Sequence, residues 1–359
     1  MEKILGVLTP VVIAGLIFLL NLLLPGRWVS GYVTRHNSDE RLRYHLNGLS
    51  VFIVAVVIWY LLGRFRIVAF DWLYRIRWFG LAGACVAGIV FSLVIVLPFK
   101  PVRKSVAADL FLGRIENFQI FKARIDLKMW LYLTGAIILE LNVLSFLSYH
   151  TGIFGGNPSP GVFLTAALLS FFVIDYLVFE EVHLYTYDLF AERIGFKLGW
   201  GCLVFYPYFY VIPLWSVLTL PDPGNQEWLL PGCSLIFLCG WTLSRGANLQ
   251  KYFFKKDPGK QFLWIKPATI TDETNTLLVN GFWGLSRHIN YLGEILMATG
   301  IVLASGYPGL IWPWLYPVYY ILLLFTRQAD DNRRCSLKYG ALWTSYEKRV
   351  PWRIIPFIY

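Results

Sequence analysis

Two polar, aromatic-rich segments near the end of the chain flank one apolar run, Ile295–Phe325. The first, Gly281–Glu294, reads GFWGLSRHINYLGE, and the second, Arg327–Tyr359, carries cations, phenols and two adjacent carboxylates. Polar groups held beside hydrocarbon usually mark a functional site, because burying them is costly. Together the cations, amide, imidazole and carboxylates suit an anionic, phosphate-bearing cofactor.

The first polar segment has helical spacing. Arg287, Asn290, Tyr291 and Glu294 recur at three and four positions, so we expect them to line one face of a helix. A simple re-entry turn between a loop and a span is the alternative. His288 has no His or Cys partner at metal-ligand spacing, so the pattern predicts no metal site.

A group of cations precedes these segments at Arg245, Lys251, Lys255 and Lys256. Lys251 and Lys255 are four positions apart and therefore share one helix face. Cations just past an apolar run can anchor the chain to lipid phosphate. They can equally clamp the phosphates of a nucleotide, and both interpretations stay open at this point.

The second polar segment contains a carboxylate whose pKa the surroundings could shift. Arg327 and Asp331 are four apart, and such a pair on a surface contributes little to stability. At the mouth of an apolar cavity the same pair could orient a ribose or a carboxamide. Asp330 next to Asp331 adds a carboxylate whose pKa could be raised by its neighbour and by burial.

A third group lies in the middle of the chain. Glu180 and Glu181 end the fifth apolar run, and we expect one to face water and the other to point into the protein. The stretch Tyr206–Tyr210 places three tyrosines around a proline that would kink a helix. These phenols could line a pocket or form an interfacial aromatic belt.

Composition identifies the class of protein that positions these groups. Of 359 residues 57% are hydrophobic and only 15% charged, with a mean hydropathy of +0.55. A soluble protein carries about 25% charged residues. Spans need about 20 mainly apolar residues. The runs that qualify or nearly qualify are Ile4–Leu24, Leu46–Leu62, Phe79–Phe99, Met129–Leu147, Val162–Phe179, Leu198–Leu218, Leu229–Leu243, Tyr291–Ala304 and Leu310–Phe325.

The predicted fold is therefore an all-α polytopic membrane protein, with about nine to ten transmembrane helices in one bundle. The net charge of +10 falls in the loops, so we attribute it to topology and lipid headgroups rather than nucleic acid. Segments 100–128, 245–287 and the tail after Phe325 are rich in Lys and Arg and are predicted to be cytoplasmic. We expect one membrane domain, 1–359.

The two polar segments resemble the sterol reductase family of membrane enzymes, which includes reductases acting at sterol carbons 14, 7 and 24(28) and the reductase domain of the lamin B receptor. Gly281–Glu294 is similar to the family pattern G-W-W-G-x-x-R-H-x-N-Y-x-G-D. The tail from Cys335 to Tyr359 is similar to C-x-x-K-Y-G-x-x-W-x-x-Y-x-x-x-V-P-Y-R-I-x-P-x-I-Y, and Asn248–Lys251 resembles S-N-x-Q-K.

The resemblance is strong over roughly the last third and weaker before it. Glu116–Gln119 departs from the family's L-N-P-R, and Leu131–Gly135 replaces its E-L-R-P-G. Asp330 and Lys255 stand where the family usually has Arg. Lys still meets a phosphate as a point charge, although not bidentately. These departures bear on the substrate more than on the cofactor.

The resemblance implies NADPH-dependent reduction of a carbon–carbon double bond in a sterol taken from the bilayer. It implies a sterol pocket shaped by helices of 1–220 and an NADPH pocket formed by 229–359. By matching positions, the cofactor-binding residues are Lys251, Lys255, Trp283, Arg287, His288, Asn290, Tyr291, Arg327, Asp331, Lys338, Tyr339 and Tyr346.

The chemistry of an olefin sets a further requirement. An unactivated double bond must be protonated before it accepts hydride, so the protein must supply a positioned acid and exclude water. Asp331, Tyr210 and Glu181 are the catalytic candidates, in no fixed order.

Two other functions stay open from the sequence. Isoprenylcysteine-type membrane methyltransferases carry an R-H-P-x-Y motif and use S-adenosylmethionine, but residue 289 here is Ile. An inactive sterol-binding membrane protein is the other alternative. We expect contacts with membrane lipids, no nucleic acid and no obligate protein partner. The expected location is the endoplasmic reticulum of a eukaryote or the inner membrane of a bacterium, with the cofactor side cytoplasmic.

Overall fold

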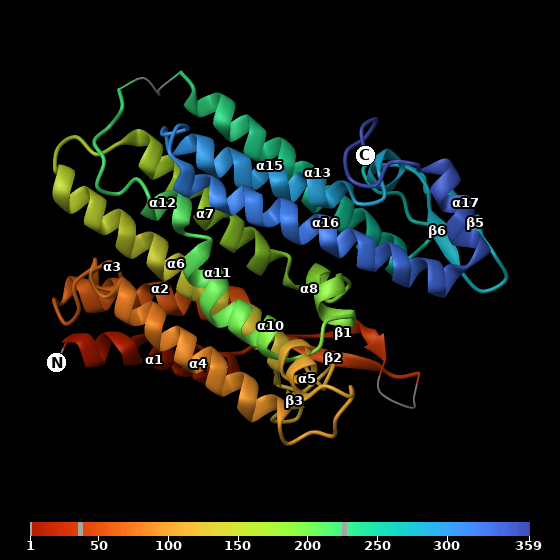
Figure 1. Ribbon diagram of the computed structural model, residues 1–359, viewed down its shortest axis with the longest axis horizontal. Coiled ribbons are helices and arrows are strands. Elements are labelled where there is room, and N and C mark those ends of the chain that lie inside the picture. Colours follow the sequence, from red (N-terminus) through yellow and green to blue (C-terminus); the bar gives the residue numbers. More distant parts are fainter. Residues whose placement is uncertain (1, 35–38, 225–227) are drawn as a thin grey trace. The chain divides into compact units, whose positions relative to one another are not determined.

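The computed structural model describes residues 2–34, 39–224 and 228–359. The chain divides into two compact units, Met1–Asp222 and Pro223–Tyr359 (Figure 1). We refer to them as the N-terminal and C-terminal units and describe each by itself. The sequence places the sterol pocket in 1–220 and the cofactor pocket in 229–359, and these assignments remain predictions.

The N-terminal unit is mostly helical. Its longer helices are α1 (Glu2–Leu23), α2 (Gly48–Arg64), α4 (Arg77–Val96), α6 (Leu127–Phe154) and α7 (Pro160–Val178). Its shorter ones are α3 (Trp72–Arg75), α5 (Val106–Leu112), α8 (Glu180–His183), α9 (Tyr187–Phe190), α10 (Phe196–Trp200), η1 (Gly201–Phe205), α11 (Tyr206–Phe209) and α12 (Ile212–Trp215).

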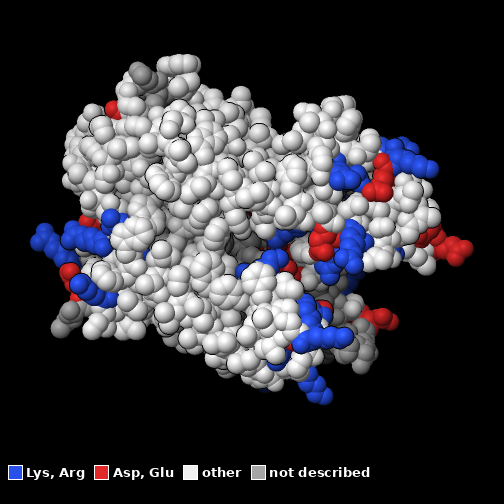
Figure 2. All heavy atoms as spheres, viewed as in Figure 1, with Lys and Arg blue, Asp and Glu red and all other residues white. Residues whose placement is uncertain are grey.

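Within the described ranges, five helical segments are long and apolar enough to cross a membrane. They are Glu2–Leu23, Arg77–Val96, Leu127–Phe154, Pro160–Val178 and Phe196–Trp215, while Gly48–Arg64 and Ile289–Ala304 are apolar but shorter. In Figure 2 the Lys, Arg, Asp and Glu side chains gather in patches and leave broad uncharged areas. The chain is thus a helical membrane protein, but the predicted count of nine to ten spans is not confirmed.

The expectation of a purely α-helical chain is incomplete, because the described part of the chain contains three antiparallel two-stranded sheets outside the apolar helices. The first pairs β1 (Arg27–Thr34) with β2 (Arg41–Leu46), and the second pairs β3 (Gln119–Ile120) with β4 (Ile125–Asp126). The third, in the C-terminal unit, pairs β5 (Thr269–Thr271) with β6 (Thr276–Leu278). Hydropathy could not reveal them, since they lie in the polar connections.

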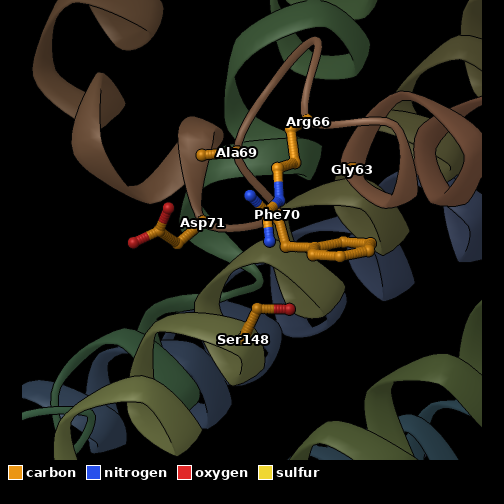
Figure 3. Close-up of a pocket in the computed structure, with 6 residues that line it drawn as sticks. All are labelled: Gly63, Arg66, Ala69, Phe70, Asp71 and Ser148. Atoms are coloured by element: carbon orange, nitrogen blue, oxygen red, sulfur yellow. The ribbon is translucent and has the colours of Figure 1, made fainter.

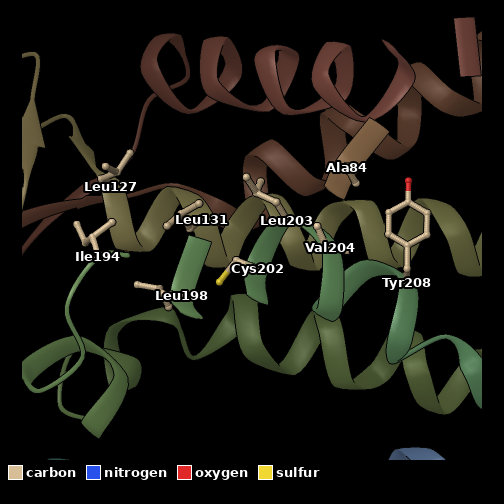
Figure 4. Close-up of a cluster of buried hydrophobic side chains, with 9 residues drawn as sticks. All are labelled: Ala84, Leu127, Leu131, Ile194, Leu198, Cys202, Leu203, Val204 and Tyr208. Carbon is tan, nitrogen blue, oxygen red and sulfur yellow. The ribbon is translucent and has the colours of Figure 1, made fainter. Parts of the chain in front are cut away.

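The core of the N-terminal unit forms around α6. Leu131 of α6 is fully buried and packs in one cluster with residues of α4, α10, η1 and α11 (Figure 4). The cluster consists of Ala84, Leu127, Leu131, Ile194, Leu198, Cys202, Leu203, Val204 and Tyr208. Since α6 is buried along most of its length, it is the central helix of this unit rather than a lipid-facing one.

The helix around Pro207, where the sequence predicts a kink, is irregular directly before the proline. Gly201–Phe205 is a π-helical turn, and Pro207 lies in the first turn of the α-helix that follows it. Proline is tolerated in a first turn, because the N–H it lacks would have no partner there. The irregularity is therefore a π-bulge, a feature frequent at functional sites, and it precedes the proline.

The C-terminal unit consists of three long helices and a polar end. The helices are α13 (Leu230–Lys256), α15 (Ile289–Ala304) and α16 (Ile311–Tyr339), and the shorter elements are α14 (Phe282–Leu285), α17 (Ala341–Arg349), β5 and β6. At 1.5 Å per residue the 29 residues of α16 extend about 44 Å, and a bilayer's hydrocarbon is about 30 Å thick. Its charged second half must therefore project beyond the hydrocarbon.

Glycines let α13 and α15 approach to backbone distance. A Cβ atom at Gly240 would lie 2.6 Å from the Gly293 carbonyl oxygen, and one at Gly293 would lie 2.5 Å from the Gly240 carbonyl oxygen. Farther along, a Cβ at Gly300 would lie 2.8 Å from the Phe237 nitrogen. Small residues are the usual means of close helix packing in membranes. The pairing is antiparallel, so the end of α13 lies beside the start of α15.

One pocket of the N-terminal unit lies at the turn between α2 and α3 (Figure 3). It is lined by Gly63, Arg66, Ala69, Phe70, Asp71 and Ser148. None of the residues that the sequence singles out as catalytic or cofactor-binding lines it.

The glycine contact yields a stability test. Gly293→Ala should lower the thermal unfolding temperature in detergent, since overpacking costs about 1–3 kcal/mol. Gly232→Ala on α13 is the matched control, because a Cβ there meets nothing within 4 Å and Ala favours the helix by up to about 1 kcal/mol. Equal effects of the two substitutions on the unfolding temperature would contradict the close packing.

Candidate functional site

The polar ends of three helices meet at one end of the C-terminal unit. The Ser244 hydroxyl of α13 donates to Glu294 Oε1 of α15 at 2.5 Å. One turn further along α13, the Ala247 carbonyl accepts from the Trp283 indole at 2.9 Å. On the other side of this end, His288 Nδ1 lies 3.8 Å from Asp331 Oδ2 of α16. The two polar segments flanking Ile295–Phe325 are thus brought together.

The buried Arg287 guanidinium joins three elements. Its Nη1 donates to Asn332 Oδ1 of α16 at 3.0 Å and also to the Glu347 carboxylate of α17. Its Nη2 donates to the Pro351 carbonyl at 3.2 Å. Hydrogen bonds that involve charged groups are stronger than neutral ones. This side chain, 6% exposed, therefore fixes the polar end of α16, α17 and the tail against the start of α15.

Backbone hydrogen bonds also connect the segment before α15 to the tail. The Arg287 N–H donates to the Trp352 carbonyl at 2.9 Å, and the His288 N–H to the Arg353 carbonyl at 2.8 Å. The Ser286 hydroxyl donates to the Ile354 carbonyl at 2.8 Å. The two stretches that match the reductase patterns most closely are therefore neighbours in space.

Aromatic rings form one wall of the site. Lys251 Nζ lies 5.6 Å from the ring centre of Trp283, within the range of a cation–π contact. The Tyr346 hydroxyl donates to the Trp283 carbonyl at 3.0 Å. Behind them Trp343 and Tyr346 are buried against Val279 and Val350, and Tyr339 packs on this cluster. Trp283, Tyr339 and Tyr346 are all residues that the sequence predicts to contact the cofactor.

His288 and Asp331 have shifted proton affinities. Burial, with the charges of Arg287 and Lys251, lowers the pKa of His288 to about 3, so the imidazole is neutral. The ring stacks on Tyr291 with centres 4.9 Å apart. Burial raises the pKa of Asp331, partly opposed by nearby cations. The charge of Asp330 makes a smaller contribution in the same direction as burial.

Cations surround Asp331 and Cys335, which are one helical turn apart on α16. Burial is the main reason that the pKa of the Cys335 thiol rises to about 12. The positive charges that act on one or both of these groups are those of Lys251, Lys255, Arg327, Arg334 and Lys338. A group of cations produces a positive potential that favours an anionic ligand.

Several buried polar atoms at the start of α15 have no hydrogen-bond partner among the described residues. They are Arg287 Nε, His288 Nε2 and Asn290 Oδ1. Buried polar atoms are nearly always paired with protein, water or ligand, and an exception needs an explanation. A donor, a ring nitrogen and an amide oxygen close together suit a ligand rich in hydroxyl, amide and phosphate groups.

The other two catalytic candidates lie in the N-terminal unit. Glu181 pairs with Arg27 at 3.2 Å, whereas Glu180 is the buried member and accepts from the Gly48 N–H at 3.2 Å. Burial raises the pKa of Glu180 to about 7. Tyr210 lies among aromatic rings, with its ring centre 4.8 Å from that of Tyr206. The expectation that one of the two glutamates faces water is not met, because the Glu181 side chain is only 13% exposed.

Sequence reasoning missed Asn332 and Glu347, the side-chain partners of Arg287. Neither has a local signal, because each is more than forty positions from Arg287 and resembles any polar residue of a solvated helix face. Asn332 also accepts from the Trp343 indole at 3.2 Å. Only the folded geometry shows that both support the site.

Comparison with known proteins gives matches over nearly the whole chain. A family model described as the Ergosterol biosynthesis ERG4/ERG24 family matches residues 8–359. A Delta(14)-sterol reductase of Arabidopsis thaliana is 32% identical over 355 residues, covering 94% of this chain and 91% of the relative. A Delta(14)-sterol reductase of Methylotuvimicrobium alcaliphilum is 35% identical over 254 residues, covering 70% of this chain and 58% of the relative. A probable 7-dehydrocholesterol reductase of Acanthamoeba polyphaga mimivirus is 29% identical over 347 residues, covering 92% and 75%.

The neutral His288 makes a pH-dependent contribution to stability. Its pKa is about 3 in the folded protein and about 6.5 when unfolded, so the unfolded state takes up the proton first. Stability is therefore full above pH 6.5 and falls as the pH drops, by about 2 kcal/mol at a pH of about 5. The unfolding temperature of the wild type should decline over this range more steeply than that of His288→Gln.

The contribution of Asp331 to the pH dependence of stability has the opposite sign, because its raised pKa adds stability as the pH falls. Asp331→Asn should consequently steepen the decline. An unchanged slope in His288→Gln would show that the imidazole is not held neutral by burial.

Proposed function

Because this chain belongs to the Ergosterol biosynthesis ERG4/ERG24 family, we propose that it reduces a carbon–carbon double bond of a sterol, with NADPH as the hydride donor. The observation that carries the proposal is the cluster of cations, rings and unpartnered polar atoms at the start of α15 and the end of α16. This cluster is formed by the segments in which the sequence most closely resembles the sterol reductases.

The residues present suit the dinucleotide. Lys251, Lys255 and Lys338 supply positive charge for its phosphates, and Arg327 supplies charge from the same helix as Asp331. Trp283 and Tyr346 offer ring faces and edges, while His288 Nε2 and Asn290 Oδ1 can hydrogen-bond its polar groups. When bound, NADPH supplies the hydride.

The proposed substrate class follows from the relatives and from the membrane. The relatives from Arabidopsis and Methylotuvimicrobium are both named Delta(14)-sterol reductases, so the double bond at sterol carbon 14 is the first to test. A sterol is dissolved in the bilayer, and the apolar helices place this chain there. The family resemblance favours a reductase over the isoprenylcysteine-type methyltransferase.

The proton for the double bond requires an acid that stays protonated near neutral pH. Asp331 is a candidate, because burial raises the pKa of its carboxyl group and the carboxyl lies 3.8 Å from His288. Tyr210 offers a phenol among rings, which could also stabilise a carbocation through their π faces. Glu181 is engaged by Arg27 in a salt bridge. We therefore propose Asp331 as the proton donor, and Tyr210 and Glu181 stay the other candidates.

The proposal is tested in a host with separate defects in sterol reduction at carbons 14, 7 and 24, with sterols measured by mass spectrometry. We expect rescue of the defect at carbon 14. Rescue of another defect would move the substrate within the same reaction. A folded chain that rescues none and consumes no NADPH would contradict the proposal, and binding of sterol alone would then favour the inactive sterol-binding protein.

Asp331→Asn should lower turnover by about 100-fold or more while NADPH still quenches tryptophan fluorescence, because general acid catalysis contributes about 10²–10⁴-fold. Asp330→Asn on the same helix is the control and should retain most of the activity, since that side chain is exposed. Full turnover of Asp331→Asn in membranes would exclude this carboxyl from the proton path.

A further inference from the structure

A two-residue hairpin turn in the C-terminal unit presents two apolar side chains at its tip. Phe262 and Ile265 exchange both backbone hydrogen bonds, at 3.1 and 2.9 Å, so Leu263 and Trp264 form the turn. Their side chains point away from the protein, and Leu263 is 55% exposed and Trp264 is 92% exposed. A tryptophan that exposed has almost no contact with the rest of the described protein.

The backbone of this turn has a conformation that is unfavourable for Leu and Trp. Both tip residues have positive φ angles, +47° at Leu263 and +63° at Trp264, as in a type I′ turn. Such turns strongly prefer Asn-Gly, Asp-Gly or Gly-Gly, because other side chains clash there with their own backbone. Packing within the chain does not offset the strain, since both side chains point outward. The Leu-Trp pair therefore needs an external contact to explain it.

The hairpin is held firmly at its base. The Phe262 ring lies 5.8 Å from that of Phe253 on α13 and 6.4 Å from that of Phe282 on α14. The Asn280 amide donates to the Lys266 carbonyl at 2.7 Å and accepts from the Ala268 N–H at 3.0 Å. The tip thus projects from a fixed base. This base contacts Phe282, the residue that precedes Trp283.

Cations flank the apolar tip. Lys256, Lys260 and Lys266 are exposed, with Lys260 Nζ 5.5 Å from the Phe253 ring and Lys256 Nζ 4.7 Å from the Tyr252 ring. Tryptophan beside lysine is typical of the membrane–water interface, where the ring lies at headgroup level and the ammonium meets lipid phosphate. The chemistry of the patch therefore matches an anionic bilayer surface.

The length of α13 brings the hairpin to that level. Its 27 residues extend about 40 Å, whereas the hydrocarbon is about 30 Å and the bilayer with headgroups about 40–45 Å thick. Phe253, which contacts the hairpin, lies in the last turn and a half of α13. We propose that the hairpin Phe262–Ile265 docks on the surface of the bilayer that holds the helices, with Leu263 and Trp264 among the headgroups and the flanking lysines on anionic lipid.

The test uses the full chain in nanodiscs whose lipids carry bromine just below the headgroups, which quenches nearby tryptophan. Comparison of the wild type with Trp264→Phe isolates the emission of Trp264. We expect this component to be quenched, and more strongly when part of the lipid is anionic. Lys260→Gln with Lys266→Gln should remove most of the dependence on anionic lipid. An unquenched Trp264 component in both lipid mixtures would overturn the proposal.

A second variant separates docking from folding. Replacing the tip by the preferred turn residues, Leu263→Asn with Trp264→Gly, relieves the backbone strain. In detergent its unfolding temperature should be no lower than that of the wild type, and a gain of about 2–4 °C is expected if the strain is relieved. A lower unfolding temperature in detergent would show that the tip packs against protein, either this chain or a second copy, and would contradict a lipid-docking role.

Discussion

The buried guanidinium of Arg287 determines how the polar end of the C-terminal unit is assembled. It bonds Asn332, Glu347 and the Pro351 carbonyl, so one side chain connects α15 with α16, α17 and the tail. Removing one partner from a buried charged network is far more costly than a lost surface bond. The positions of Asp331 and Tyr346 depend on this connection, because they lie on α16 and α17, which it joins.

The membrane supplies the complementary constraint. α13 and α16 are longer than hydrocarbon requires, so their last turns must be polar and must lie at one end of the unit. The glycine contact between Gly240 and Gly293 brings α13 against α15 at backbone distance. Lysines of α13 and the carboxylate of Asp331 on α16 consequently meet around the start of α15, and the site follows from helix length as much as from motif.

The sequence predicted the helical membrane class and the apolar runs, because hydrophobic length is a local signal. The candidate residues of the C-terminal cluster came mainly from motifs that resemble those of the sterol reductases. The sequence did not predict the three hairpins, the π-helical turn at Gly201–Phe205 or the partners of Arg287. Those features depend on contacts between distant residues. The strained tip at Leu263 and Trp264 was invisible for a different reason, since positive φ at non-glycine residues contradicts local preference.

The central claim is that the cluster around Asp331 and Trp283 holds NADPH for sterol reduction. The most direct measurement incubates the purified chain with a sterol unsaturated at carbon 14 and NADPH that carries deuterium at the transferable position of its nicotinamide. The account predicts a reduced sterol that contains one deuterium from the cofactor. A reduced sterol without deuterium, or no conversion by a folded chain, would contradict it.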